Sequence, residues 1–304
     1  MSENGKPMTR PQTPFKKRLR RFKMQLSTML GRPEGFFSPY RYADMVAPTG
    51  YPELEPTFEA ALVTTAADGE PGMAGYLDIA EARMPDIQAA LGEPPKPRFE
   101  QGWFTGLDAV AAFVMASQVT ANRIVEVGSG HSTRFLAAGA AARMASMRAD
   151  GGAELRETEI ICIDPVPRAV LQGLPVTWRE TILTPEHFSL FQSLEPGDIA
   201  FFDSSHLLWP GSDVDLIFNR ILPILKPGVL VHIHDILLPD AYPDVWEWRG
   251  YTEQNGLAGW FAGGAYHLVW ASHWLGSRDQ LGARAALRAV HPSPSGGSIW
   301  MRRA

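Results

Sequence analysis

The sequence has 304 residues, of which 45% are hydrophobic and 20% are charged, which is the composition of an ordinary globular protein. This length suffices for one large domain, or for a domain with a smaller cap. The formal net charge of −5 gives no indication of a nucleic-acid-binding protein, so no nucleic acid is expected as a partner.

Residues 1–30 form a basic arm in which apolar side chains recur at helical spacing. The apolar positions are Phe15, Leu19, Phe22, Leu26 and Met29 or Leu30, and the basic ones are Lys16, Lys17, Arg18, Arg20, Arg21 and Lys23. A helix of this kind can lie on an anionic membrane or dock on a partner, so residues 14–30 predict a peripheral membrane contact. A solvated helix packed on its own domain, or a frayed tail, is the alternative.

Nothing else in the sequence indicates a membrane or an oxidising compartment. No run of about 18 apolar residues is present, and the basic N-terminus lacks the apolar core of a signal peptide. The one cysteine, Cys162, lies in the apolar run EIICID and is interpreted as a core residue. We expect a cytoplasmic protein that is able to associate with the inner face of the membrane.

Residues 31–100 are rich in proline and glycine and predict a cap or lid of short helices and loops. From residue 101 to 304 the pattern changes to short apolar runs separated by helical stretches, at 123–127, 160–164, 198–203 and 229–235. This alternation predicts an α/β fold, a doubly wound, mostly parallel Rossmann-like sheet with helices on both faces. Two later runs, 266–272 and 298–303, predict a closing hairpin at one edge. The ligands of such a sheet bind beyond the carboxyl ends of its strands.

The stretch VEVGSGHST follows the first predicted strand and opens a helix. Gly128 and Gly130 let the backbone turn tightly and approach a ligand, and Ser132 or Thr133 can cap the helix. A dinucleotide fingerprint would have glycine where Thr133 stands and an acid well before Asp164, which argues against NAD. An acid at the tip of the second strand can instead accept hydrogen bonds from the ribose of an adenosine. Glu126 can organise the loop that holds a cationic amino-acid tail.

The chain here resembles the class I S-adenosylmethionine-dependent methyltransferases. The resemblance rests on IVEVGSGHSTRF, ICIDPVPR, GDIAFFDSSH, LKPGVLVHIHDILLP and GGSIWMRR, and covers roughly residues 100–304, with GFFSPYRYAD similar to the N-terminal segment of one bacterial subgroup. It implies S-adenosylmethionine as cofactor. The residues that it implies around the cofactor are Glu126, Gly128, Ser129, Gly130, Ser132, Asp164 and Asp203.

Acids and histidines also end the fourth and fifth predicted strands. Asp203 is followed by His206, and His234 and Asp235 end the other strand. Metal-dependent sugar and polyketide O-methyltransferases look similar here, which implies a divalent metal, Mg²⁺ or Mn²⁺, on Asp203, His234 and Asp235. Those relatives have an acid where His234 stands, and imidazole suits Mg²⁺ poorly. A metal-free site, with the acids hydrogen-bonded to loop amides and histidines, is the alternative.

His232 lies about 7 Å from His234 on the same strand face and is interpreted as structural. His206 is the candidate general base for methyl transfer, with Asp203 and Asp235 beside it, although it could simply brace its loop. Asp213 and Asp215 are interpreted as helix-start residues after Ser212.

The sequence thus predicts a methyltransferase that acts on a hydroxyl of a small polar acceptor, a sugar or a glycosylated metabolite. An N-acceptor, a non-catalytic cofactor-binding or membrane-binding module, and, less favoured, an NAD-dependent oxidoreductase are the competing readings. The pattern gives neither the oligomeric state nor the pathway.

Overall fold

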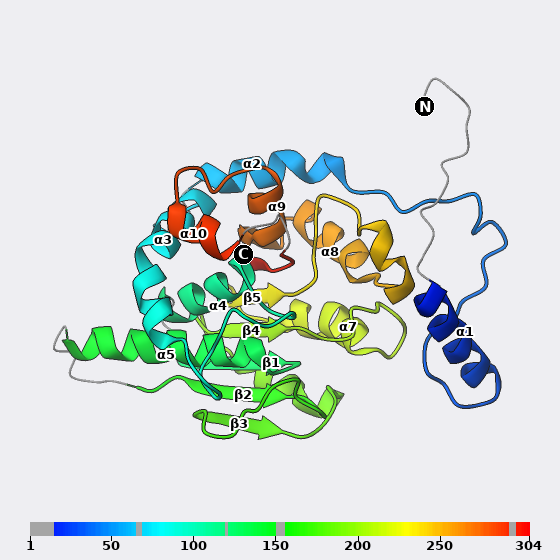
Figure 1. Ribbon diagram of the computed structural model, residues 1–304, viewed down its shortest axis with the longest axis horizontal. Coiled ribbons are helices and arrows are strands. Elements are labelled where there is room, and N and C mark those ends of the chain that lie inside the picture. The colour runs from blue at the N-terminus through cyan, green and yellow to red at the C-terminus, as the bar shows by residue number, and fades with distance from the viewer. Residues whose placement is uncertain (1–14, 65–68, 119–120, 150–155, 292–295) are drawn as a thin grey trace.

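A seven-stranded sheet forms the centre of the protein, as seen in a computed structural model that describes residues 15–64, 69–118, 121–149, 156–291 and 296–304. Its strand order is β3-β2-β1-β4-β5-β7-β6, and Figure 1 shows the part from β3 to β5. The strands β1 to β5 run parallel, whereas β7 is antiparallel to both of its neighbours. The strands are β1 Arg123–Val127, β2 Glu159–Ile163, β3 Val176–Arg179, β4 Ile199–Phe202, β5 Leu230–Ile233, β6 Tyr266–Ala271 and β7 Ile299–Arg303.

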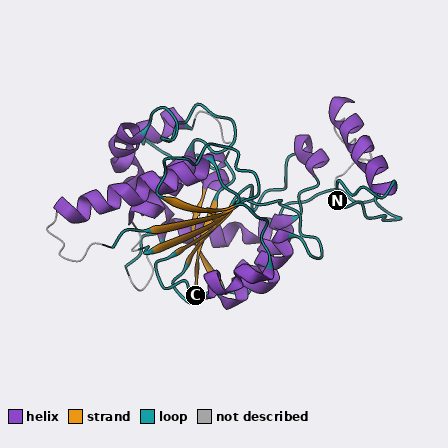
Figure 2. Ribbon diagram, turned by 90° about the horizontal axis from the view of Figure 1, so that it is seen from below, coloured by secondary structure: helices purple, strands orange, loops and turns teal. Residues whose placement is uncertain are grey.

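Helices lie on both sides of this sheet (Figure 2), which confirms the predicted α/β fold class. The α-helices are α1 Phe15–Met29, α2 Glu55–Val63, α3 Met73–Ala90, α4 Leu107–Gln118, α5 His131–Ala149, α6 Phe188–Gln192, α7 Asp213–Leu216, α8 Glu253–Ala262, α9 Ser272–Ser277 and α10 Ala285–Val290. A π-helical turn, Ile217–Ile221, continues α7, and 3₁₀ turns occur at Pro52–Leu54, Pro185–His187, Leu222–Ile224 and Asp244–Arg249. None of the described helices is both long and apolar enough to cross a membrane.

The helix α4 is buried along almost its whole length because it lies between neighbouring elements rather than at the surface. It packs against α5 on one side and α3 on another. Gly139 of α5 permits this close contact, since a Cβ there would lie 2.3 Å from the carbonyl oxygen of Phe113. As a result, Asp108, in the first turn of α4, lies in the core of the protein.

The segment between residues 51 and 98 packs onto the edge of the sheet. Its helices α2 and α3 contact β6, and Glu55 accepts hydrogen bonds from Trp274 at 2.6 Å and from Arg278 at 2.9 Å. Arg278 also pairs with Asp240, in the loop after β5. These contacts attach the segment to the 101–304 region, whereas the division of the chain at residues 30 and 100 stays a prediction.

The strand order reverses between β1 and β4, which is where a doubly wound sheet binds its ligands. The two strands end side by side, with Val127 paired to Phe202. The amide of Asp203 donates to the carbonyl of Val127 at 2.9 Å, so the chain leaves both strands in contact. Gly128 and Asp203 follow directly and open the candidate site.

Candidate active site

Gly128 is required by the close approach of two turns. Its φ is +76°, and a Cβ at this position would lie 1.8 Å from the carbonyl oxygen of Asp203. Gly130, with φ of +150°, has the amide of Ala169 3.1 Å from where its Cβ would be. Both glycines of the predicted turn therefore have a steric reason to be present.

Glu126, near the end of β1, stabilises this turn and is completely buried. Its carboxylate accepts hydrogen bonds from the hydroxyls of Ser132 at 2.6 Å and Thr133 at 2.7 Å. The Thr133 hydroxyl in turn accepts from the amide of Gly130 at 2.9 Å. Burial raises the pKa of Glu126 to about 7, against the lowering effect of these hydrogen bonds. Glu126 and Ser132 thus shape the turn rather than line a cavity.

Asp164 follows β2 and joins the turn to the second strand. One carboxylate oxygen accepts from the amide of Ser129 at 2.6 Å, and the other accepts from the amide of Val166 at 2.7 Å. The indole of Trp178 donates to the Asp164 carbonyl at 2.8 Å. This bracing fixes the carboxylate at the tip of the strand.

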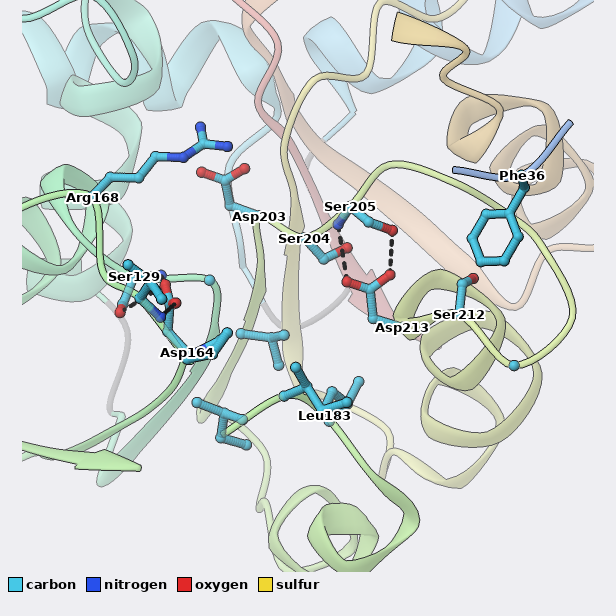
Figure 3. A pocket seen from close by; sticks show the side chains of 17 residues that line it. Phe36, Ser129, Asp164, Arg168, Leu183, Asp203, Ser204, Ser205, Ser212 and Asp213 are labelled. Carbon is cyan, nitrogen blue, oxygen red and sulfur yellow. Dashed lines mark hydrogen bonds between the residues drawn. The ribbon is translucent and has the colours of Figure 1, made fainter. Parts of the chain in front are cut away.

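A cavity of about 460 Å³ opens beyond these strand ends (Figure 3). In the figure, Ser129 and Asp164 lie at one side and Phe36 and Ser212 at the other. Of the residues predicted to surround the cofactor, four line this cavity: Gly128, Ser129, Asp164 and Asp203. We name it the first cavity.

Ser212 confirms a prediction at the wall of this cavity, because it caps α7. Its hydroxyl accepts from the amide of Asp215 at 3.2 Å. Asp213, the first residue of the helix, accepts a hydrogen bond from the amide of Ser205 at 3.0 Å. The Asp215 carboxylate accepts a hydrogen bond from the amide of Gly211 at 2.8 Å, so both acids act at the helix start, as the sequence indicates.

A second cavity, of about 520 Å³, lies on the other side of Asp203 and shares Asp203 and Arg168 with the first. Its polar wall carries His234, Asp235 and Arg249, and its aromatic wall carries Trp103, Trp246 and Tyr251. Arg249 lies 4.2 Å from the centre of the Trp246 ring and 3.4 Å from Asp235. Two adjoining chambers of mixed polar and aromatic character are suited to two ligands in contact.

The ends of β4 and β5 bring the predicted acids and histidines together. The Asp203 carboxylate lies 3.4 Å from His206 Nε2 and 3.4 Å from His234 Nδ1. Asp235 lies 3.6 Å from His206 Nε2 and 3.8 Å from His234 Nδ1. The two imidazoles hold the pKa of Asp203 well below its usual value, despite its burial.

His206, the predicted general base, is surrounded by carboxylates in this arrangement. It is buried, with Nδ1 2.8 Å from the Glu253 carboxylate and Nε2 facing Asp203 and Asp235. Burial lowers its pKa, but hydrogen bonds and charge from Asp203, Glu253 and Asp235 outweigh burial and raise the pKa to about 10. A general base must be neutral near the working pH, so a raised pKa works against this role in the absence of a metal. The assignment of His206 as general base therefore stays a prediction.

The sequence does not predict that two further acids, Asp108 and Glu253, belong to this cluster. Asp108 of α4 lies 3.5 Å from His234 Nε2, and its pKa is lowered to about 2 although burial opposes this. Glu253 of α8 is the partner of His206. An acid inside the apolar run GLDAVAAFVM was the available signal for Asp108, whereas YTEQNG gives no comparable signal for Glu253.

The predicted structural role of His232 is confirmed. Its ring lies fully buried, stacked on Phe201 with centroids 3.7 Å apart, and its Nε2 lies 2.8 Å from the Ser298 hydroxyl. Burial and the neighbouring His234 depress the pKa of His232 well below its usual value. Cys162 is likewise buried, as predicted.

The donor set fits a divalent metal in part. Among the described residues, Asp203, His206 and His234 each offer a ligand atom, and these atoms lie within 4.8 Å of one another. The sequence predicts His234 with Asp203 and Asp235, so His206 is the addition. Imidazole and carboxylate ligands together suit Mn²⁺, Fe²⁺ or Zn²⁺ better than Mg²⁺.

Comparison with known proteins gives one informative match. Residues 125–236 match a family model described as a methyltransferase domain. No curated protein matches the chain. Among solved structures, a protein of Thermobifida fusca YX described as a candidate methyltransferase aligns over 82% of this chain and 94% of its own, at 11% identity and a TM-score of 0.38. The matched region runs from β1 to β5 with the turns that follow these strands, so this part of the chain is similar to a methyltransferase domain.

Proposed function

We propose that the protein transfers a methyl group from S-adenosylmethionine in the first cavity to a hydroxyl of a small polar acceptor in the second. The observation that supports this most is the junction of the two cavities at Asp203. In-line displacement needs the sulfonium carbon and the attacking oxygen in contact, and two chambers that share a wall allow this. The bound cofactor supplies an electrophilic methyl group on a cationic sulfur.

The first cavity suits the adenosyl cofactor through its charge and its exposed backbone. Asp164 stands at the tip of β2, where it would accept hydrogen bonds from ribose hydroxyls, and Gly128 lets the backbone come close to the ligand. The carboxylates of Asp203 and Asp164 also favour a cationic ligand. Glu126 acts indirectly, because Ser132 and Thr133 already use both of its oxygens.

The second cavity supports an acceptor rich in hydroxyl groups. Trp103, Trp246 and Tyr251 offer flat apolar faces, and Asp203, Asp235 and Arg249 offer hydrogen-bonding groups between them. Aromatic faces combined with acids and amides are a usual means of holding a sugar ring. We therefore favour a sugar or a glycosylated metabolite as the acceptor.

Asp235 is our candidate for the group that receives the hydroxyl proton. It lines the second cavity and remains partly exposed, whereas His206 is buried behind it and lines neither cavity. His206 then serves as a positioning residue that holds Asp203 and Asp235 in place. A divalent metal bound by Asp203, His234 and His206 or Asp235 would lower the pKa of the acceptor hydroxyl.

The decisive experiment is a methyl-transfer assay that follows labelled S-adenosylmethionine over a panel of sugars, glycosides, phenols and amines, with Mn²⁺, with Mg²⁺ or with a chelator. We expect transfer to a sugar or glycoside hydroxyl, and retention of the label in a methyl ether. Calorimetry on the same preparation measures binding of S-adenosylmethionine, S-adenosylhomocysteine and NAD. Binding of NAD in place of the adenosylmethionine pair, or transfer only to amines, would contradict the proposal.

A further inference from the structure

The helix α1 presents its apolar side to solvent instead of to the protein. The side chains on this stripe are exposed to the following extents: Phe15 77%, Leu19 56%, Phe22 62%, Leu26 45% and Met29 83%. No residue of the helix is buried. A surface helix of a globular protein normally turns such a stripe toward the core, so this orientation is the reverse of the usual one.

The contacts of α1 with the rest of the protein explain this orientation. The helix touches the 3₁₀ turn Asp244–Arg249, where Lys17 Nζ lies 5.0 Å and the Arg20 guanidinium 5.8 Å from the Trp248 ring. At 100° per residue, Lys17 and Arg20 lie on the opposite side of the helix from Leu19 and Leu26. The basic side therefore faces the protein through cation–π contacts, and the apolar side faces outward. The helix itself lies at the periphery of the molecule (Figure 1).

The charge of α1 indicates what the apolar stripe meets. The helix carries six basic side chains and no acidic one over residues 15–29. Lys16 and Lys23 border the stripe on one side and Arg18 borders it on the other, where long cationic side chains can reach phosphate groups while the apolar side chains are immersed. This arrangement complements an anionic lipid surface, and repels a basic protein surface.

The chain that follows α1 also exposes aromatic residues. Phe36 is 50% exposed, Tyr40 59% and Tyr42 49%. Tyrosine is enriched at the level of lipid headgroups, where one end of the ring is wet and the other apolar. The Phe36 ring also stacks on Trp209, 5.2 Å between centroids, and lines the first cavity. Phe36 thus connects the segment after α1 with the wall of the candidate active site.

From this geometry we propose that α1 binds peripherally to an anionic lipid bilayer, with its apolar stripe at the boundary between headgroups and acyl chains. The inference stands apart from the proposed reaction, because it uses neither the cofactor nor the acceptor. Bound in this way, α1 holds the first cavity near the bilayer through the segment that contains Phe36.

The test is co-sedimentation of the full chain with vesicles of phosphatidylcholine alone, or containing about 30% phosphatidylglycerol. We expect binding to the anionic vesicles that weakens by roughly tenfold or more in the double variant Leu19→Glu and Phe22→Glu. The matched control is Val63→Glu with Val170→Glu, two exposed apolar residues on other surfaces, at 74% and 59% exposure. This control should bind as the unaltered protein does.

A second variant separates charge from apolar contact. Lys16→Gln, Arg18→Gln and Lys23→Gln should reduce binding to anionic vesicles and remove most of its salt dependence between about 0.05 and 0.5 M. Circular dichroism checks that every variant keeps its fold, which is expected since none of these side chains is buried. Equal binding by the unaltered protein and the Leu19/Phe22 variant would overturn the proposal. So would absence of vesicle binding together with a dimer, seen by sedimentation velocity, that this variant dissociates.

Discussion

Only glycine fits at position 128, because the turn there touches the backbone of Asp203. Gly128→Ala should lower the free energy of unfolding by about 2–4 kcal/mol, since the new Cβ cannot occupy the 1.8 Å left to the Asp203 carbonyl. Gly264→Ala is the control, because Gly264 has φ of +66° but no atom within 4 Å of its Cβ position. That change should cost only the left-handed backbone penalty, about 1 kcal/mol. Urea unfolding measures both, and equal losses would show that the contact between turns is unimportant.

Asp164 is the residue on which cofactor affinity should depend most. Asp164→Ala removes the acceptor proposed for the ribose and the brace of the Ser129 amide, so binding of S-adenosylmethionine should weaken by about 10- to 100-fold, as measured by calorimetry. Asp198→Ala is a matched control. Asp198 also accepts from backbone amides, those of Asn122 and Arg123, but it precedes β4 and lies away from both cavities. Asp198→Ala should lower the free energy of unfolding and leave the affinity of the folded protein for S-adenosylmethionine unchanged.

The raised pKa of His206 has a consequence for stability. Protonated His206 stabilises the fold fully below its unfolded pKa of about 6.5, and this contribution is lost as the pH rises through its folded pKa of about 10. With a chelator present, the free energy of unfolding should therefore fall between about pH 7 and pH 10 more steeply in the unaltered protein than in His206→Gln. Parallel pH profiles of the two proteins would refute the ion cluster as described.

At the scale of elements, β4 and β5 end together and so determine whether a metal can bind. Mn²⁺ at millimolar concentration should raise the melting temperature of the unaltered protein, and Mg²⁺ should raise it less, because two imidazoles face the carboxylates. Asp203→Asn should abolish the Mn²⁺ effect, whereas Asp279→Asn, at an exposed acid outside the cluster, should keep it. If Mn²⁺ still raises the melting temperature of Asp203→Asn, the metal binds at another site.

The elements also show how far the sequence predicts this fold. The strands β1, β2, β4 and β5 lie within about two residues of their predicted ranges, because buried parallel strands are continuous apolar runs that end in acids or glycine. β6 and β7 were also predicted, as an antiparallel pair at one edge. The sequence does not predict β3, since VTWR lies at an exposed edge of the sheet and carries only a weak hydrophobic pattern.

The site was predictable where it depends on strand ends, and not where it depends on helix packing. Parallel strands bring their carboxyl ends to one edge, so Asp164, Asp203 and Asp235 could be placed together from the sequence. Asp108 and Glu253 reach the cluster from α4 and α8, whose docking no local pattern reveals. The raised pKa of His206 follows from these tertiary contacts, which no local pattern predicts.

At the scale of the whole molecule, contacts distant in sequence connect the N-terminal segment with the neighbourhood of the site. Arg278 pairs with Glu55 and with Asp240, which itself lines the second cavity. Arg278→Ala should thus raise the acceptor KM more than it alters cofactor affinity, since the Asp240 carboxylate loses Arg278 and keeps its contact with His273, while the first cavity is untouched. Arg288→Ala is the control, because its partner Asp279 is exposed and lines neither cavity. Equal effects of both changes on KM would show that Arg278 has no influence on acceptor binding in the second cavity.

The position of β7 has a consequence for how the chain folds. Ile299–Arg303 is the last strand in chain order, yet it inserts between β5 and β6 and pairs with both. Until β7 docks, the edges of β5 and β6 that it covers are open, and exposed edges of this kind invite pairing between molecules. The sheet therefore cannot close between β5 and β6 before β7 is available, so folding of this part must wait for the last of the seven strands.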